Sequence, residues 1–324
     1  MRSQPFRLGL LTCALLAPSC AAPRGTARVT PAGPYVLVLG TAQDGGYPQI
    51  ACREELCRAA RADPARRRLV ASVLLVDPLS GRRWLFDATP DLPQQIELAG
   101  GHAGPAPDAP GRPPLFDGIF LTHAHMGHYT GLVHLGREAY GTAATPVFAT
   151  ARMGRFLAQN GPWSLLFDEG RLTHVELKPE QVVDLGGGLR VTALAVPHRQ
   201  EFSDTVAFLI EGPERSLLYL PDIDKWELWD RSIEELLGQV DVALLDATFF
   251  DGDELPGRDM QAIPHPFVVD SLERFGPLPA SLRAKVHFVH LNHSNPLLDA
   301  GSPASARVRA AGMQVAREGQ LFEL

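Results

Sequence analysis

The chain has 324 residues, of which 45% are hydrophobic and 21% are charged, and this composition is typical of a globular protein with a large buried core. It excludes a chain that is disordered over most of its length. The formal net charge is −7, which gives no electrostatic reason to expect a nucleic-acid partner, so we expect a small-molecule substrate.

Residues 1–22 have the pattern of an export signal. Two arginines precede the apolar run 8–17, and small residues and Cys20 follow it. The run is too short to span a membrane as a mature helix. The four residues that end in Cys20 are loosely similar to lipoprotein signals, in which the cysteine is lipidated after cleavage, and ordinary cleavage two residues later is the alternative. We therefore expect an exported protein that is either periplasmic or anchored in the membrane as a lipoprotein.

The rest of the chain divides into a linker and one domain. Residues 23–34 are rich in Pro, Gly and Thr and predict the linker, and residues 35–324 predict a single domain. Short apolar runs, several bounded by Gly, Pro or Asp, predict strands at 35–40, 70–76, 83–87, 118–121, 189–196, 205–211, 215–220, 241–246 and 286–290. Helical patterns lie between some of them, at 53–62, 91–99, 151–159, 231–239 and 267–275.

The order of these elements favours one architecture. Strands come in consecutive pairs as well as alternating with helices, which favours two sheets flanked by helices over one doubly wound sheet. The Gly/Pro/Ala-rich segment 101–114 has no periodicity and predicts a surface insertion.

Three histidines follow the predicted strand 118–121, in the sequence His123-Ala-His125-Met-Gly-His128. Imidazoles two residues apart in an extended turn point the same way, and a third at the start of a helix can complete the set around one ion. A divalent ion held mainly by neutral imidazoles lowers the pKa of a bound water toward neutrality and makes hydroxide available as a nucleophile. The cluster therefore predicts a metal-dependent hydrolase.

This cluster resembles the H-x-H-x-D-H signature of metallo-β-lactamase-fold hydrolases, and further parts of that pattern lie at the ends of other predicted strands. The resemblance implies an α/β protein built as a four-layer αββα sandwich, with metals at one edge. It also implies that Asp87 is a structural aspartate beneath the site and that Asp222 bridges two metals. The implied metal ligands are His123, His125, His128, His198, Asp222 and His290. Zinc is the expected metal, as one or two ions, with manganese or iron as alternatives.

The chain departs from the signature at Gly127, where the family has an aspartate that normally binds the second metal. The first site keeps all of its implied ligands, whereas the second keeps His128, Asp222 and His290. A second metal is therefore weakened but not excluded. Asp224 can supply the lost carboxylate only if its loop folds back.

A second resemblance concerns the start of the predicted domain. The segment Gly40-Thr-Ala-Gln-Asp-Gly-Gly-Tyr-Pro-Gln49, followed by Cys52 and Cys57, is similar to the opening of pyrroloquinoline-quinone biosynthesis protein B. Thr89-Pro-Asp91 and Asn292-His-Ser-Asn-Pro296 are similar as well. Those biosynthetic proteins usually lack the full histidine cluster that this chain retains. The resemblance implies an alternative function in iron-dependent oxidation, because histidine-rich sites with an open position also suit iron.

A third resemblance is to the cyclic-phosphodiesterase branch of phosphonate breakdown, which holds a structural zinc. His293, three residues after His290, matches that branch, and the resemblance implies a structural zinc on Cys52, Cys57 and His293. A disulfide between the two cysteines is the alternative. The resemblance also implies that His265 protonates the leaving group, as a catalytic residue beside Asp222.

Three functions follow from these patterns. The first is hydrolysis of a phosphodiester or related ester by metal-activated hydroxide. The second is the iron-dependent oxidation of the quinone-biosynthesis type. The third is a non-catalytic lipoprotein that binds a metal or ligand, which the loss of the aspartate at Gly127 keeps open.

Overall fold

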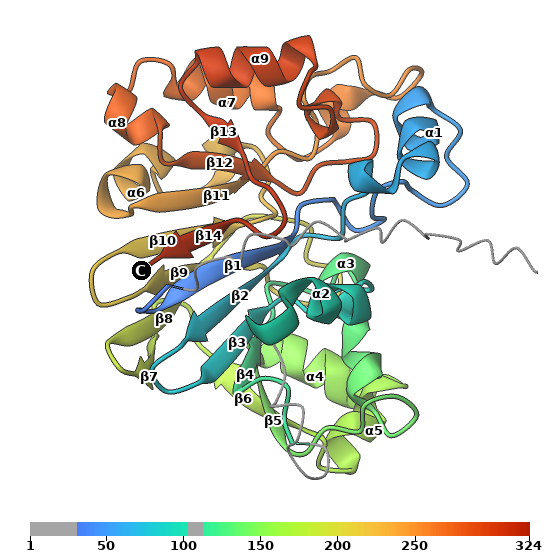
Figure 1. Ribbon diagram of the computed structural model, residues 1–324, viewed down its shortest axis with the longest axis vertical. Helices are drawn as coiled ribbons and strands as arrows, with labels where there is room; N and C mark the ends of the chain where they lie inside the picture. Colours follow the sequence, from blue (N-terminus) through green and yellow to red (C-terminus); the bar gives the residue numbers. More distant parts are fainter. Residues whose placement is uncertain (1–30, 103–112) are drawn as a thin grey trace, which may run out of the picture. The chain divides into compact units, whose positions relative to one another are not determined.

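The computed structural model describes residues 31–102 and 113–324, and two mixed sheets lie at the centre of this part of the chain (Figure 1). The first sheet has the order β14 (Leu321–Glu323), β1 (Tyr35–Gly40), β2 (Ser72–Asp77), β3 (Arg82–Phe86), β4 (Gly118–Phe120), β5 (Thr145–Thr150) and β6 (Leu172–Leu177). The second has the order β13 (Gln314–Val315), β12 (Val286–Val289), β11 (Val242–Asp246), β10 (Ser216–Leu220), β9 (Val206–Glu211), β8 (Leu189–Ala195) and β7 (Val182–Gly186).

Each sheet is antiparallel in one half and parallel in the other. Strands β1 to β3 pair antiparallel and β3 to β6 pair parallel, while β7 to β10 pair antiparallel and β10 to β13 pair parallel. Neighbouring parallel strands end at the same edge of their sheet, so the loops that follow them gather there.

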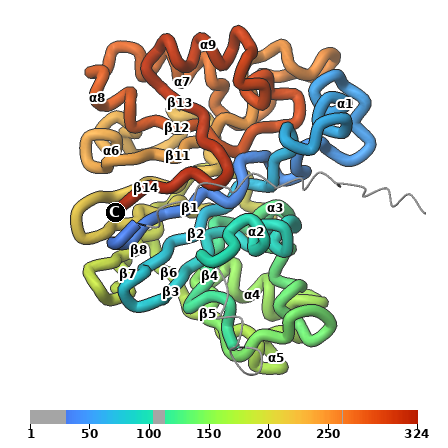
Figure 2. The backbone as a smooth tube through the Cα atoms, in the orientation of Figure 1, coloured from blue at the N-terminus to red at the C-terminus, as the bar shows by residue number. Residues whose placement is uncertain are grey.

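Helices cover the outer face of each sheet (Figures 1 and 2). Against the first sheet lie α2 (Leu92–Ala99), α3 (Met126–Tyr129), α4 (Ala151–Gln159) and α5 (Trp163–Asp168). With the second sheet lie α1 (Glu55–Ala62), α6 (Ile233–Gln239), α7 (Val268–Phe275), α8 (Ala280–Arg283) and α9 (Pro303–Ala310). Hydroxyl caps start several of them: Thr150, Ser232 and Ser302 each accept a backbone N–H of the first turn of α4, α6 and α9.

The core has three layers of side chains, as the alternation of strand residues requires. In β1, Val36 and Val38 pack between the two sheets, whereas Tyr35, Leu37 and Leu39 pack against the helices. A third layer packs the other face of the second sheet against its own helices. The predicted four-layer αββα arrangement is therefore confirmed.

Every predicted strand and helix is present, within two residues of its predicted bounds. The sequence did not predict β5, β6 and β7, among other short elements. Strands β6 and β7 are the outermost strands of their sheets, and most of their side chains are at least partly exposed. They consequently lack the apolar runs that mark buried strands.

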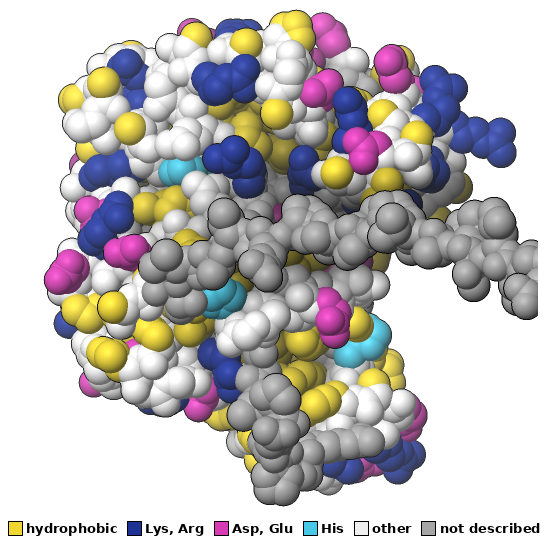
Figure 3. All heavy atoms as spheres, in the orientation of Figure 1, with side chains coloured by type: hydrophobic (Ala, Val, Ile, Leu, Met, Phe, Trp, Pro, Cys, Tyr) yellow, Lys and Arg dark blue, Asp and Glu magenta, His cyan; other side chains and the backbone are white. Residues whose placement is uncertain are grey.

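Several predictions fall outside the described residues: the export signal at 1–22, most of the linker at 23–34 and most of the insertion at 101–114. Over 31–102 and 113–324, no helix is long and apolar enough to cross a membrane. On the face drawn in Figure 3, acidic and basic side chains are interspersed among uncharged ones.

Candidate metal centre

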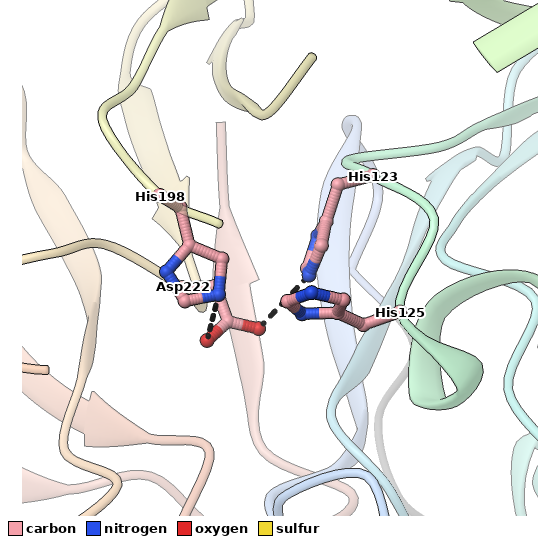
Figure 4. Close-up of side chains that lie close together, drawn as sticks. All are labelled: His123, His125, His198 and Asp222. Carbon is pink, nitrogen blue, oxygen red and sulfur yellow. Dashed lines mark ion pairs between the residues drawn. The ribbon is translucent and has the colours of Figure 1, made fainter. Parts of the chain in front are cut away.

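The predicted ligands come together at the edge where strands of both sheets end. His123 and His125 follow β4 in the first sheet, while His198, Asp222 and His290 follow β8, β10 and β12 in the second. Figure 4 shows four of them pointing toward one another from the two sheets. All of these side chains except that of His125 are buried.

The first ligand group consists of His123, His125, His198 and Asp222, whose ligand atoms all lie within 4.8 Å of one another. The Nε2 atom of His123 is 3.5 Å from Asp222 Oδ2, and the Nε2 atom of His198 is 3.6 Å from Asp222 Oδ1 (Figure 4). Three imidazoles and one carboxylate are a donor set that suits zinc.

The second ligand group consists of Asp44, His128, Asp222 and His290, again within 4.8 Å of one another. The Nε2 atom of His128 is 3.0 Å from Asp222 Oδ2 and 3.2 Å from Asp44 Oδ1. The Nε2 atom of His290 is 3.3 Å from Asp222 Oδ2. Asp222 therefore lies between the two groups, in the bridging position that the sequence resemblance implied.

Asp44 is the one member of these two groups that the sequence did not predict. It lies in the turn after β1, within the segment Gln43-Asp-Gly-Gly46. The available signal was an acidic residue in a glycine-rich turn that follows the end of a strand. Asp44 lies far from the histidine cluster in the chain, so nothing in the sequence indicated that it joins those ligands.

Unpartnered buried atoms show that the two groups fit a metal. Within the described part of the chain, six buried atoms have no hydrogen-bond partner although they point into the centre: Asp44 Oδ1, His123 Nε2, His128 Nε2, His198 Nε2, Asp222 Oδ2 and His290 Nε2. An unsatisfied buried polar group costs roughly 1–3 kcal/mol. Six such atoms that converge are accounted for when metal ions are their partners.

Hydrogen bonds to the Nδ1 atoms orient four of the imidazoles. The Nδ1 atom of His123 lies 3.0 Å from Thr122 Oγ1, and that of His128 lies 2.8 Å from Asp87 Oδ2. The Nδ1 atom of His198 lies 2.9 Å from Asp224 Oδ1, and that of His290 lies 3.0 Å from Thr248 Oγ1. These contacts direct the Nε2 atoms to the centre. Asp224 thus supports His198 and is not the replacement for the carboxylate missing at Gly127.

Asp87 is buried directly beneath the centre. Besides His128, its carboxylate accepts hydrogen bonds from the Thr122 backbone N–H at 2.9 Å and the Tyr219 hydroxyl at 3.3 Å. Asp87 and His290 both have left-handed backbone conformations, with φ of 65° and 63°. Such conformations are uncommon for residues other than glycine and tend to cluster at functional sites.

Burial and neighbouring charges shift the pKa values of the ligands in both directions. Burial lowers the pKa of His128, but the carboxylates of Asp87, Asp222 and Asp44 outweigh this effect and hold it well above its ordinary value, whereas the shifts of His123 and Asp222 favour their metal-binding forms. The pKa of His123 lies well below its ordinary value, because burial and the nearby His128 both oppose its protonation. Burial raises the pKa of Asp222, but the imidazoles of His290 and His128 outweigh this effect and hold it well below its ordinary value. A neutral imidazole and an ionised carboxylate are the forms that bind metals.

His265 lies at the edge of the first ligand group, between Ala262 and the start of α7. Its Nδ1 atom is 2.7 Å from Asp246 Oδ2 and 3.5 Å from Asp222 Oδ1. Burial opposes its protonation, yet the carboxylate of Asp246 prevails and raises the pKa of His265 to about 9. An imidazolium therefore stands beside the ligands at neutral pH.

The structure does not bring together the other predicted site. Within the described residues, Cys52 and Cys57 are both free thiols, and with His293 they form no group of converging ligand atoms. Cys57 is buried in the apolar core with α1, where burial and the adjacent Cys52 thiol raise its pKa to about 11. This environment favours the protonated thiol over a zinc-bound thiolate. The structural zinc and the alternative disulfide therefore stay predictions.

Comparison with known proteins gives consistent matches. A family described as "Beta-lactamase superfamily domain" matches residues 82–292. Coenzyme PQQ synthesis protein B of Stutzerimonas stutzeri is 29% identical over 90% of this chain and 100% of that protein. The protein of the same name from Rhizobium meliloti is 26% identical over 89% of this chain and 97% of that protein.

Solved structures show the same similarity. The Zn²⁺-bound PqqB of Methylobacterium extorquens matches with a TM-score of 0.73 and 25% identity, over 90% of this chain and all of that one. A diphosphatase of the PhnP family matches with a TM-score of 0.61 and 22% identity, over 90% of this chain and 97% of that one. The second similarity shows a shared fold.

Proposed function

Because the chain belongs to the β-lactamase superfamily, we propose that it is a metal-dependent hydrolase that cleaves a phosphodiester or a related ester. The observation that carries this proposal is the set of buried ligand atoms without partners at one edge of the two sheets. When bound, zinc would act as a Lewis acid and lower the pKa of a coordinated water, which is the chemistry that ester hydrolysis needs.

The residues of the chain have distinct roles in this proposal. His123, His125 and His198 would hold one ion together with Asp222, which belongs to the second ligand group as well. His265, held at Nδ1 by Asp246, supplies a proton to the leaving group as a general acid. Its positive charge also favours the approach of an anionic diester.

Apolar side chains beside the ligands bear on the substrate class. Met126 follows His125 directly and is 52% exposed, and Phe202 is 57% exposed. Phe202 follows Glu201, whose carboxylate lies 3.2 Å from His125 Nε2, and its ring stacks on Phe156. An exposed aromatic surface next to the first ligand group favours an ester with an apolar or aromatic substituent.

A metal measurement combined with a substrate panel tests the function. We expect the protein, purified without added metal, to contain zinc and to hydrolyse bis(p-nitrophenyl) phosphate. A chelator should abolish turnover, and added zinc should restore it. The panel should include a lactone and a peptide, so that the reaction class is tested as well. No turnover of any of these substrates with zinc, manganese or iron, together with no dioxygen consumption, would favour a non-catalytic binding protein.

The similarity to coenzyme PQQ synthesis protein B favours a second candidate, a role in the synthesis of that cofactor through iron-dependent oxidation. Relatives of that name match about nine-tenths of this chain. Iron in the purified protein, together with dioxygen consumption and no diester hydrolysis, would favour this candidate over the hydrolase.

We also propose that the protein is exported and anchored through Cys20, on the pattern of residues 1–22. With its native amino terminus, the protein is expected in the membrane fraction of a Gram-negative host and to incorporate labelled palmitate. Cys20→Ala should abolish labelling and release the protein from the membrane. A wild-type protein that stays in the cytoplasm contradicts export, and a periplasmic, unlabelled one contradicts the anchor.

A further inference from the structure

The sequence leaves the second ligand group one carboxylate short of the signature, because Gly127 stands where the signature has an aspartate. In the structure, the space beside Gly127 is filled. A Cβ atom built on Gly127 would lie 2.1 Å from Asp44 Oδ1, 2.8 Å from Asp44 Cγ and 2.7 Å from Asp44 Cα. Atoms cannot approach this closely, so a side chain at position 127 and Asp44 in its present place exclude each other.

The backbone does not require glycine at this position. Gly127 is absent from the residues of positive φ in the described chain, so its conformation is one that an aspartate also adopts. Space, and not backbone conformation, therefore explains the glycine. The group that uses this space is the carboxylate of Asp44.

The Asp44 carboxylate is directed at the second ligand group. Its Oδ1 atom is buried without a hydrogen-bond partner among the described residues, and it lies 3.2 Å from His128 Nε2 and 3.7 Å from His290 Nε2. Asp222 Oδ2 approaches the same two nitrogen atoms from its own strand. Two carboxylates and two imidazoles thus surround one point. Asp44 supplies the carboxylate that the signature places at position 127.

The turn that carries Asp44 is fixed to the strand end that carries His290. The Gln43 N–H donates to the Leu291 carbonyl at 2.9 Å, and the Leu291 N–H donates to the Thr41 carbonyl at 2.9 Å. Within the turn, the Gly46 N–H donates to the Gln43 carbonyl at 2.8 Å. Backbone bonds on both sides of the turn hold Asp44 in register with a ligand, as a preorganised metal site requires.

We propose that Asp44 replaces the missing aspartate of the signature, so that Asp44, His128, His290 and Asp222 form a complete second metal site, with Gly127 as the residue that makes room for it. The site would take a divalent cation such as zinc or manganese, since it offers two carboxylates and two imidazoles. This inference rests on the metal centre of the proposed function but does not require that the reaction be hydrolysis.

Metal binding by the full chain tests the proposal without an activity assay. We expect the wild type to bind two equivalents of Zn²⁺, measured by elemental analysis after dialysis, and Asp44→Asn to retain about one. In a chelator-competition titration, the second Zn²⁺ ion should bind to Asp44→Asn at least about 100-fold less tightly than to the wild type. This loss is larger than the one expected when a residue that only orients a ligand is removed. Asp204→Asn, which changes an exposed carboxylate outside both groups, should retain two equivalents.

Filling the space beside Gly127 gives a second test. Gly127→Ala should retain about one equivalent, because its Cβ atom would overlap Asp44 Oδ1 and Cα and displace the Asp44 carboxylate. His123→Ala removes a ligand of the first site and should lose the Zn²⁺ equivalent that binds there. Circular dichroism and the thermal unfolding midpoint separate metal loss from misfolding, and Asp44→Ser serves if Asp44→Asn does not fold.

Two outcomes would overturn the proposal. One is an Asp44→Asn protein that is folded and binds as much Zn²⁺ as the wild type, with unchanged affinity. The other is a folded Gly127→Ala protein that still binds two equivalents with unchanged affinity. A wild type that binds two equivalents through Asp44 but hydrolyses no ester would refute the proposed function and leave this inference standing.

Discussion

Asp222→Ala is expected to remove both metal equivalents and to abolish ester hydrolysis. The Oδ1 atom of Asp222 faces His198 and its Oδ2 atom faces His123 (Figure 4). The Oδ2 atom also faces His128 and His290. No other carboxylate among the described residues belongs to both metal-ligand groups that contain those histidines. Removing it withdraws one donor from each site at once.

The expected loss of activity is large. A metal ion contributes several kcal/mol of transition-state stabilisation, and each 1.4 kcal/mol is a factor of about ten, so we expect a fall in kcat/KM of roughly 10³-fold or more. Zinc content and hydrolysis of bis(p-nitrophenyl) phosphate are measured on the same preparation. Asp224→Asn is the matched control, because it changes a carboxylate that only orients His198 at 2.9 Å, and it should weaken metal binding by roughly 10–100-fold. Asp222→Ala protein that keeps both zinc ions would contradict the bridging role.

His265→Ala is expected to slow hydrolysis in a way that depends on the leaving group. An alkoxide leaves only when it is protonated, so a diester with an alkyl leaving group should lose about 10²–10⁴-fold in kcat. A p-nitrophenolate ion is stable without a proton, and its release should change little. Parallel assays of a methyl and a p-nitrophenyl diester measure the difference. Equal losses for both substrates would assign His265 to binding or structure instead of proton transfer.

The ion pair of His265 gives a second readout in the metal-free protein. Because the pKa of His265 is raised to about 9 from its ordinary value of 6.5, its contribution to stability is fully present below pH 6.5 and is lost as the pH rises through about 9. The urea midpoint of chelator-treated wild type should therefore exceed that of His265→Ala by more at pH 6.5 than at pH 9.5. A constant difference would contradict a charged His265 paired with Asp246.

Local sequence was sufficient for most of the strands that lie inside the sheets, with β5 as the exception. Continuous apolar runs predict buried strands, and β1 is buried along its whole length. The same reasoning failed for β6 and β7, which lie at the sheet edges and carry exposed side chains. An edge strand is held by backbone hydrogen bonds to one neighbour, and these leave little pattern in the side chains.

The candidate site divides in the same way. The spacing His123-Ala-His125-Met-Gly-His128 at the end of a strand, together with the resemblance that it carries, was enough to group the six predicted metal ligands. Their assignment required only that strands end at a common edge. In the structure these six side chains do converge there, in two groups that share Asp222.

Only the tertiary structure decided which other side chains join them. It places Asp44 against Gly127, Asp224 behind His198, and Cys57 in an apolar core apart from any metal-ligand group of the described residues. The physical reason is that the end of a strand determines where the next side chains point, and this can be recognised from the local sequence. A contact between a turn and a distant helix depends instead on how the whole sheet packs. By itself, the sequence determined that this protein has a histidine-rich metal centre, and packing decided that its missing aspartate is replaced from elsewhere in the chain.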